Sequence, residues 1–171
     1  MDTRLGPWFT AFLRAACQLA AFPSILASHM APDRRLLDAR VYLAALRAMA
    51  QVDGLLHPKE RAFLDSQARD FDIALSELPS LEALLRTGPF PEPETAAAIV
   101  RDVIFLAHLD GDYQEPERAR ALSIAELLGV GPAFANLQQD VVRRLSQDPL
   151  QPPPLWFRAI VSDSLGSHSF E

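Results

Sequence analysis

Apolar residues in this chain recur at intervals of three and four, the spacing that places them on one face of an α-helix. No stretch shows the alternation of apolar and polar residues that is typical of a half-buried β-strand. Proline and glycine interrupt the helical pattern and mark where one helix ends and the next begins. We expect about eight helices, at residues 7–22, 36–52, 58–72, 76–86, 93–109, 116–128, 132–146 and 155–165. The pattern therefore predicts an all-α protein, a single compact bundle of about seven to eight helices.

Two halves of the predicted bundle resemble each other in sequence. The matched pairs, at a constant offset of 57 residues, are Asp53 with Asp110, Gly54 with Gly111, Glu60 with Glu117 and Arg61 with Arg118. The helices expected at 36–52 and 93–109 are apolar around most of their circumference, which is typical of helices at the centre of a bundle. We therefore expect an internal two-fold repeat, with these two helices packed against each other.

The charge and the cysteine content exclude several classes of site. The chain has 171 residues and a formal net charge of −6, so it carries no basic footprint for nucleic acid, and we expect no nucleic-acid partner. Cys17 is the only cysteine, which excludes an internal disulfide and a multi-cysteine zinc site.

The apolar N-terminal stretch does not have the pattern of a membrane span. Arg14, Gln18 and Pro23 interrupt it, whereas a spanning helix needs roughly 20 mostly apolar residues. It also lacks the basic start and clean apolar run of a signal peptide. We expect no transmembrane segment and a cytoplasmic location. As an amphipathic helix, residues 7–22 either pack on their own domain or make peripheral contact with a partner or a membrane surface.

The two Asp-Gly segments can be explained as tight corners between helices. Gly54 and Gly111 follow predicted helices, where a left-handed backbone often ends a helix and penalises any Cβ. Glu60 and Glu117 then fall in the first turn of the next helix, near its free N–H groups. On this interpretation, the acidic residues only cap helices.

The same acidic residues also suit a divalent cation, and the two interpretations remain open. An Asp before a loop and a Glu after it can converge on one point, and oxygen ligands favour Ca²⁺ or Mg²⁺. The candidate metal ligands are Asp53, Glu60, Asp110, Asp112 and Glu117. The spacing is not that of an EF-hand loop. His57 and His108 lie beside these acids and make Zn²⁺ a less favoured alternative.

The segments "AMAQVDGLLHPKERAFL" and "FLAHLDGDYQEPERARALSIAELLGV" resemble the TerB-like family, which is named for bacterial tellurite resistance and has a relative beside membrane-anchored J-domain co-chaperones. The resemblance covers residues 36–147 and rests on Asp-Gly followed by Pro-x-Glu. Val52 and Leu109 stand where the family usually has alanine. The resemblance implies a non-enzymatic helical module associated with stress resistance in bacteria. It also implies metal binding through the positions equivalent to Asp53, Glu60, Asp110 and Glu117.

The C-terminal segment joins a proline-rich spacer to an aromatic helix. Polyproline is stiff and holds a following segment away from its own domain at low entropic cost. The residues that could then anchor in a protein partner are Leu155, Trp156, Phe157 and Ile160. The alternative is that this helix folds back onto its own bundle.

No nucleophile–base arrangement, glycine-rich phosphate loop or zinc signature occurs in the chain, and we expect no enzymatic activity. The predicted organisation is an N-terminal amphipathic helix and linker at 1–35, a duplicated helical domain at 36–147, and a proline-rich linker with a C-terminal helix at 148–171. We expect an interaction or scaffolding module that binds a protein partner. A divalent-metal sensor that uses the acidic corners is the alternative.

Overall fold

The computed structural model describes residues 32–52, 54, 57–109, 111, 113–147 and 155–166; of residues 32, 33, 35 and 162–166 it describes the backbone only. The predicted helix at 7–22 lies outside the described residues. So do three of the candidate metal ligands, Asp53, Asp110 and Asp112.

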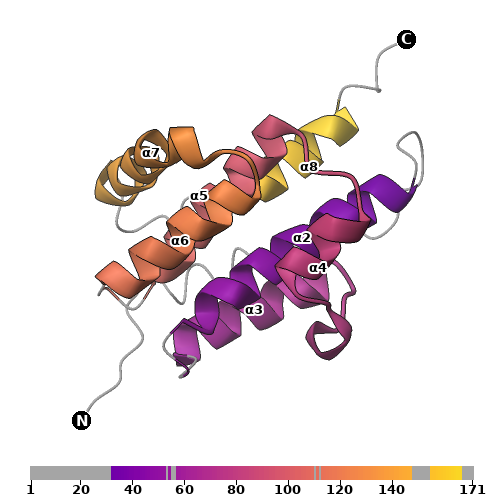
Figure 1. Cartoon of the computed structure of the whole chain (residues 1–171), viewed down its shortest axis with the longest axis horizontal. Coiled ribbons are helices and arrows are strands. Elements are labelled where there is room, and N and C mark those ends of the chain that lie inside the picture. Colours follow the sequence, from indigo (N-terminus) through magenta and orange to yellow (C-terminus); the bar gives the residue numbers. More distant parts are fainter. Residues whose placement is uncertain are drawn as a thin grey trace.

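All regular structure in the described residues is helical, as the apolar spacing predicts. The helices are α2 (Pro32–Ala50), α3 (Pro58–Asp70), α4 (Leu81–Thr87), α5 (Pro93–Ala107), α6 (Glu115–Leu127), α7 (Phe134–Gln147) and α8 (Trp156–Gly166). Short 3₁₀ turns, η1 (Leu75–Glu77) and η2 (Gly131–Ala133), precede α4 and α7. Figure 1 shows these helices packed into one compact bundle. None of the described helices combines the length and apolar character needed to cross a bilayer.

Two predicted helices are wrong at their starts. The helix expected at 36–52 begins earlier, at Pro32, inside the predicted linker, because proline fits the first turn of a helix. The helix expected at 76–86 begins later. The backbone of Leu78 is extended, as is favoured for a residue before proline, and α4 begins only at Leu81. The Ser80 side chain accepts a hydrogen bond from the backbone N–H of Ala83 at 3.2 Å and caps the helix. Arg47 of α2 donates to the carbonyl oxygens of Leu75 and Pro79, which fixes this turn against the bundle.

The helices α2 and α5 form the centre of the core. They contact each other extensively, and α3 and α4 lie beside α2 while α6, α7 and α8 lie beside α5 (Figure 1). Every residue from Val41 to Leu46 is buried, as is every residue from Ala98 to Val100 and from Asp102 to Ala107. A helix buried on most of its circumference must lack a polar face, which explains why these two segments are apolar nearly all round.

Backbone features recur at the offset of 57 residues. Gly54 and Gly111, as predicted, both have positive φ, at 70° and 93°. Asp72 after α3 and Gly129 after α6 also have positive φ, at 53° and 76°. At each of these two helix ends, the N–H of the following residue donates a hydrogen bond to a carbonyl oxygen of the helix. Ile73 donates to Ala68, and Val130 donates to Ala125. These bonds are the long hydrogen bond of a Schellman motif, so α3 and α6 end in the same way.

Candidate functional site

The two acidic corners place a glutamate at the start of a helix in the same way. The N–H of His57 donates to Glu60 Oε2 at 3.0 Å, and the N–H of Gln114 donates to Glu117 Oε2 at 2.7 Å. Both glutamates are buried, at 8% and 5% exposure. Each carboxylate therefore satisfies an N–H group that its helix leaves free and lies at the positive end of the helix dipole.

The two corners lie next to each other at one end of the bundle. The ammonium of Lys59, in the first turn of α3, donates to the carbonyl oxygen of Leu109 at 3.2 Å, just before the second Asp-Gly segment. A positive charge therefore lies where the corners meet. Among the described residues, no three His, Cys, Asp or Glu side chains gather closely enough to hold a metal ion. Of the candidate ligands, the structure places only Glu60 and Glu117.

The C-terminal helix α8 packs on its own bundle. Leu155 and Phe157 belong to the core, at 7% and 0% exposure. The ring of Phe157 stacks on Tyr42 with centroids 4.3 Å apart, and it meets Phe71 edge to face at 5.7 Å. Of the four residues predicted to anchor a partner, Leu155 and Phe157 are thus occupied within the chain. Trp156 and Ile160 are only partly buried.

A buried carboxylate that the sequence did not single out holds the start of α8. Asp102 lies in the middle of α5 with no exposed surface. Its two oxygens accept from the backbone N–H groups of Trp156, at 3.0 Å, and of Phe157, at 3.1 Å. Burial raises the pKa of Asp102 to about 7, while these two N–H groups and the Tyr42 hydroxyl act to lower it. Asp102 is therefore an N-terminal cap supplied by a different helix.

A second polar contact fixes α8 to α3. Arg158 donates from Nε to Gln67 Oε1 at 3.1 Å and forms an ion pair with Asp70. The Tyr42 hydroxyl donates to the same oxygen of Gln67 at 3.4 Å. Burial raises the pKa of Tyr42 well above its usual value and lowers the pKa of Arg158. Polar contacts to α3 and α5 therefore flank the buried ring of Phe157.

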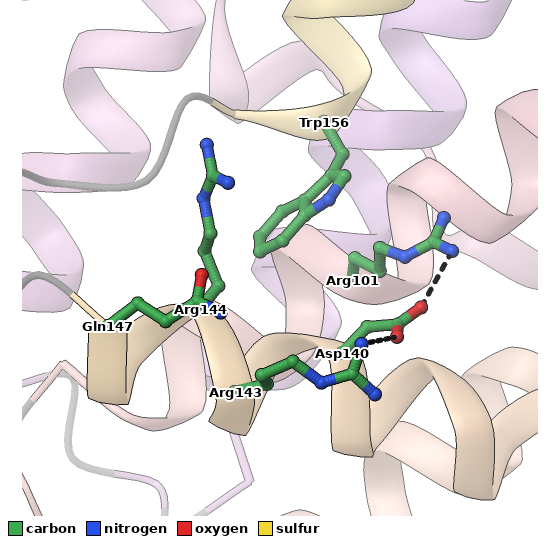
Figure 2. A pocket seen from close by; sticks show the side chains of 6 residues that line it. All are labelled: Arg101, Asp140, Arg143, Arg144, Gln147 and Trp156. Carbon is green, nitrogen blue, oxygen red and sulfur yellow. Dashed lines mark hydrogen bonds and ion pairs between the residues drawn. The ribbon is translucent and has the colours of Figure 1, made fainter.

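Residues of α5, α7 and α8 line an open, arginine-rich pocket, shown in Figure 2. Its volume is about 440 Å³, and its lining residues are Arg101, Asp140, Arg143, Arg144, Gln147 and Trp156. We call it the arginine pocket. Asp140 forms ion pairs with Arg101, at 3.1 Å, and with Arg143, at 3.8 Å. The lining thus carries three guanidinium groups and one carboxylate, so its net charge is positive although that of the chain is negative.

No pattern in the sequence predicts that the residues lining the arginine pocket lie close together. Trp156 was a candidate because it belongs to the aromatic C-terminal helix, but Arg101 and Arg144 have no local pattern that joins them to it. One signal was present: Arg101 and Asp102 are charged residues within an otherwise apolar helix, and a charge in such a place is normally paired. Asp102 faces the core and Arg101 lines the pocket.

Comparisons with protein-family profiles, with curated proteins and with solved structures give no match for this chain. The TerB-like resemblance of residues 36–147 therefore remains a prediction from its motifs.

Proposed function

We propose that this protein is a non-enzymatic interaction module that binds a protein partner through the face formed by α5, α7 and α8. One observation carries the proposal: Trp156, whose backbone is fixed by Asp102, presents a partly exposed indole beside three arginines. Tryptophan and arginine are the residues most enriched among those that dominate binding at protein interfaces. A side chain held on a fixed backbone also loses less conformational entropy when a partner binds.

The TerB-like resemblance supports the same class of function, because it implies a helical module without catalysis. We propose in addition that residues 36–147 are two halves related by an internal two-fold. The matched capping glutamates, Glu60 and Glu117, and the matched helix ends at Asp72 and Gly129 support this relation. A cytoplasmic location and a role in stress resistance remain predictions from the sequence.

Site-specific crosslinking tests the interaction proposal. A photoreactive phenylalanine analogue replaces exposed Gln147 at the rim of the arginine pocket, and the matched control replaces exposed Glu77 in η1. We expect a defined adduct in cells from position 147 and not from position 77. Trp156→Ala should abolish this adduct, while the backbone N–H groups of residues 156 and 157 can still donate to Asp102. The same adducts from both positions, or none from position 147, would contradict the proposal.

A divalent-metal sensor is the second candidate function. The observation in its favour is that the two acidic corners adjoin, as the contact from Lys59 to Leu109 requires. The observation against it is that the Lys59 ammonium occupies the same region and repels cations. A thermal melt of the wild type and of Asp53→Asn/Asp110→Asn, with EDTA, Ca²⁺, Mg²⁺ or Zn²⁺, separates the two. Binding to the folded state raises Tm by mass action, so an ion that stabilises only the wild type supports a sensor. No shift at millimolar ion excludes it.

A further inference from the structure

The arginine pocket has more positive charge than its own acid can balance. Asp140 binds one guanidinium end of Arg101 and lies 3.8 Å from one end of Arg143. The side chain of Arg143 is still 66% exposed. Arg144 is exposed and has no ion pair within the described part of the chain. A ligand with carboxylate groups would therefore find Arg144 and the outer side of Arg143 ready to donate.

A second hollow continues the arginine pocket across α7. It has a volume of about 550 Å³ and is lined by Arg118, Ala135, Gln138, Gln139, Val142 and Arg143. Because Arg143 lines both, the two hollows adjoin. Val142 is 44% exposed, one of the few large apolar side chains exposed in the described residues. The surface therefore offers one apolar contact in each hollow, Trp156 in the first and Val142 in the second, and Arg143 lines both.

This arrangement favours a peptide over other anions. A free phosphate would make no apolar contact with the partly exposed indole of Trp156 or with the exposed Val142, and it would meet the carboxylate of Asp140 inside the pocket. A nucleic acid needs cations along its whole backbone. Here Arg118, at the far end, is already paired with Glu115 at 3.4 Å, and the chain as a whole has a net charge of −6. Carboxylates spaced between apolar side chains match both the charges and the apolar contacts.

We propose that the arginine pocket and the adjoining hollow bind an acidic peptide segment of the partner protein, with its carboxylates on Arg143 and Arg144 and its apolar side chains on Trp156 and Val142. This inference rests on the proposed function and names the chemistry of the partner. The Arg101–Asp140 pair positions the pocket wall and makes no direct contact with the peptide. Asp140 competes with the peptide for Arg143.

Fluorescence anisotropy with a fluorescein-labelled peptide of glutamate and leucine tests the proposal. A peptide with lysine in place of each glutamate, a single-stranded oligonucleotide and inorganic phosphate serve as competitors. We expect saturable binding of the acidic peptide that weakens with added salt. Arg144→Glu should weaken binding by about tenfold or more, since a charge-assisted hydrogen bond is lost and a repulsive charge is added. The matched control, Arg61→Glu at an exposed position of α3, should leave affinity unchanged.

Two further variants sharpen the test. Asp140→Asn should strengthen binding, because it removes the competing acid from Arg143. In a Trp8→Phe background, the emission of Trp156 should change on peptide binding, since it is then the only tryptophan. Equal binding to the wild type and Arg144→Glu, no binding at millimolar peptide, or displacement by phosphate or oligonucleotide but not by unlabelled acidic peptide would each overturn the proposal. If these occur while the crosslink from position 147 persists, the interaction function stands and only the acidic-peptide assignment fails.

Discussion

Asp102 in α5 caps the helix that begins at Trp156, 54 residues further along the chain. The same stretch of α5 supplies Arg101 to the arginine pocket, and the capped residue supplies its indole. One buried carboxylate therefore joins the helix that supplies Arg101 to the helix that supplies Trp156. Burying the charge of Asp102 is costly, and the two N–H groups and the positive end of the α8 dipole offset only part of that cost.

The free energy of unfolding should depend on the protonation of Asp102. Burial raises the pKa of this carboxyl from its ordinary 3.8 to about 7, so the folded chain keeps the proton at higher pH than the unfolded chain does. Protonation therefore favours the folded state. The resulting stability is fully present below about pH 3.8, is lost as the pH rises towards 7, and is absent above that.

Denaturant unfolding of the wild type and Asp102→Asn across this range measures the effect. The stability of the wild type relative to the variant should fall between about pH 4 and 7, by up to a few kcal/mol, since each pKa unit corresponds to about 1.4 kcal/mol. Subtracting the variant removes the titration of the exposed carboxyls. A difference that is constant with pH would show that Asp102 binds its proton equally in the folded and unfolded chain.

Removing the C-terminal helix should destabilise the bundle. Phe157 is fully buried and stacks on Tyr42, and truncating such a side chain typically costs about 3–5 kcal/mol. We expect both Phe157→Ala and truncation after residue 148 to lower Tm by about 10 °C or more, because a chain of this size loses about 2–4 °C per kcal/mol. Truncation after residue 166 is the control. An unchanged Tm after truncation at 148 would mean that α8 is free to dock elsewhere.

Much of this fold can be predicted from local sequence, and the reason is visible at particular residues. The two central helices can be predicted because apolar residues, such as Val41 in one and Ile99 in the other, occur around most of the circumference of each helix. The glycines at 54 and 111 are predicted because a left-handed backbone favours glycine. The predicted start of α4 is wrong because the helical spacing of apolar residues continues across Pro79, from Leu78 to Leu81. The helical backbone, in contrast, begins only at Leu81.

The candidate site is less predictable, because tertiary packing assembles it. Asp102 binds backbone N–H groups of a distant helix, and a backbone donor has no sequence signature. Arg101 meets Asp140 only because α5 packs against α7. The aromatic residues of the last helix predict a segment that docks on a partner. Phe157, however, fills the core of its own bundle. A stripe of apolar residues on a helix therefore does not show whether the helix packs on another protein or on its own domain.

The capping role of the buried glutamates gives a prediction that separates it from metal binding. Glu60→Ala and Glu117→Ala should each lower the free energy of unfolding by about 1 kcal/mol, because each leaves a backbone N–H without its acceptor. Chemical denaturation in EDTA measures the loss, and Glu77→Ala at an exposed position is the control. A loss seen only when a divalent ion is present would indicate that the glutamates act as ligands instead.

The ends of α3 and α6 allow a matched pair of substitutions. Asp72 and Gly129 occupy the same place in the two helix ends, and both have left-handed backbones. A residue with a Cβ is strained in this conformation by about 1 kcal/mol. Asp72→Gly should therefore stabilise the protein, by a few tenths of a kcal/mol to about 1 kcal/mol, after the greater flexibility of glycine in the unfolded chain is subtracted.

Gly129→Ala should destabilise the protein by about 1 kcal/mol. A Cβ at Gly129 would meet no atom within 4 Å beyond its two chain neighbours, so backbone strain alone is tested. Opposite signs in thermal melts would confirm that the two ends are equivalent, whereas changes of the same sign would contradict it.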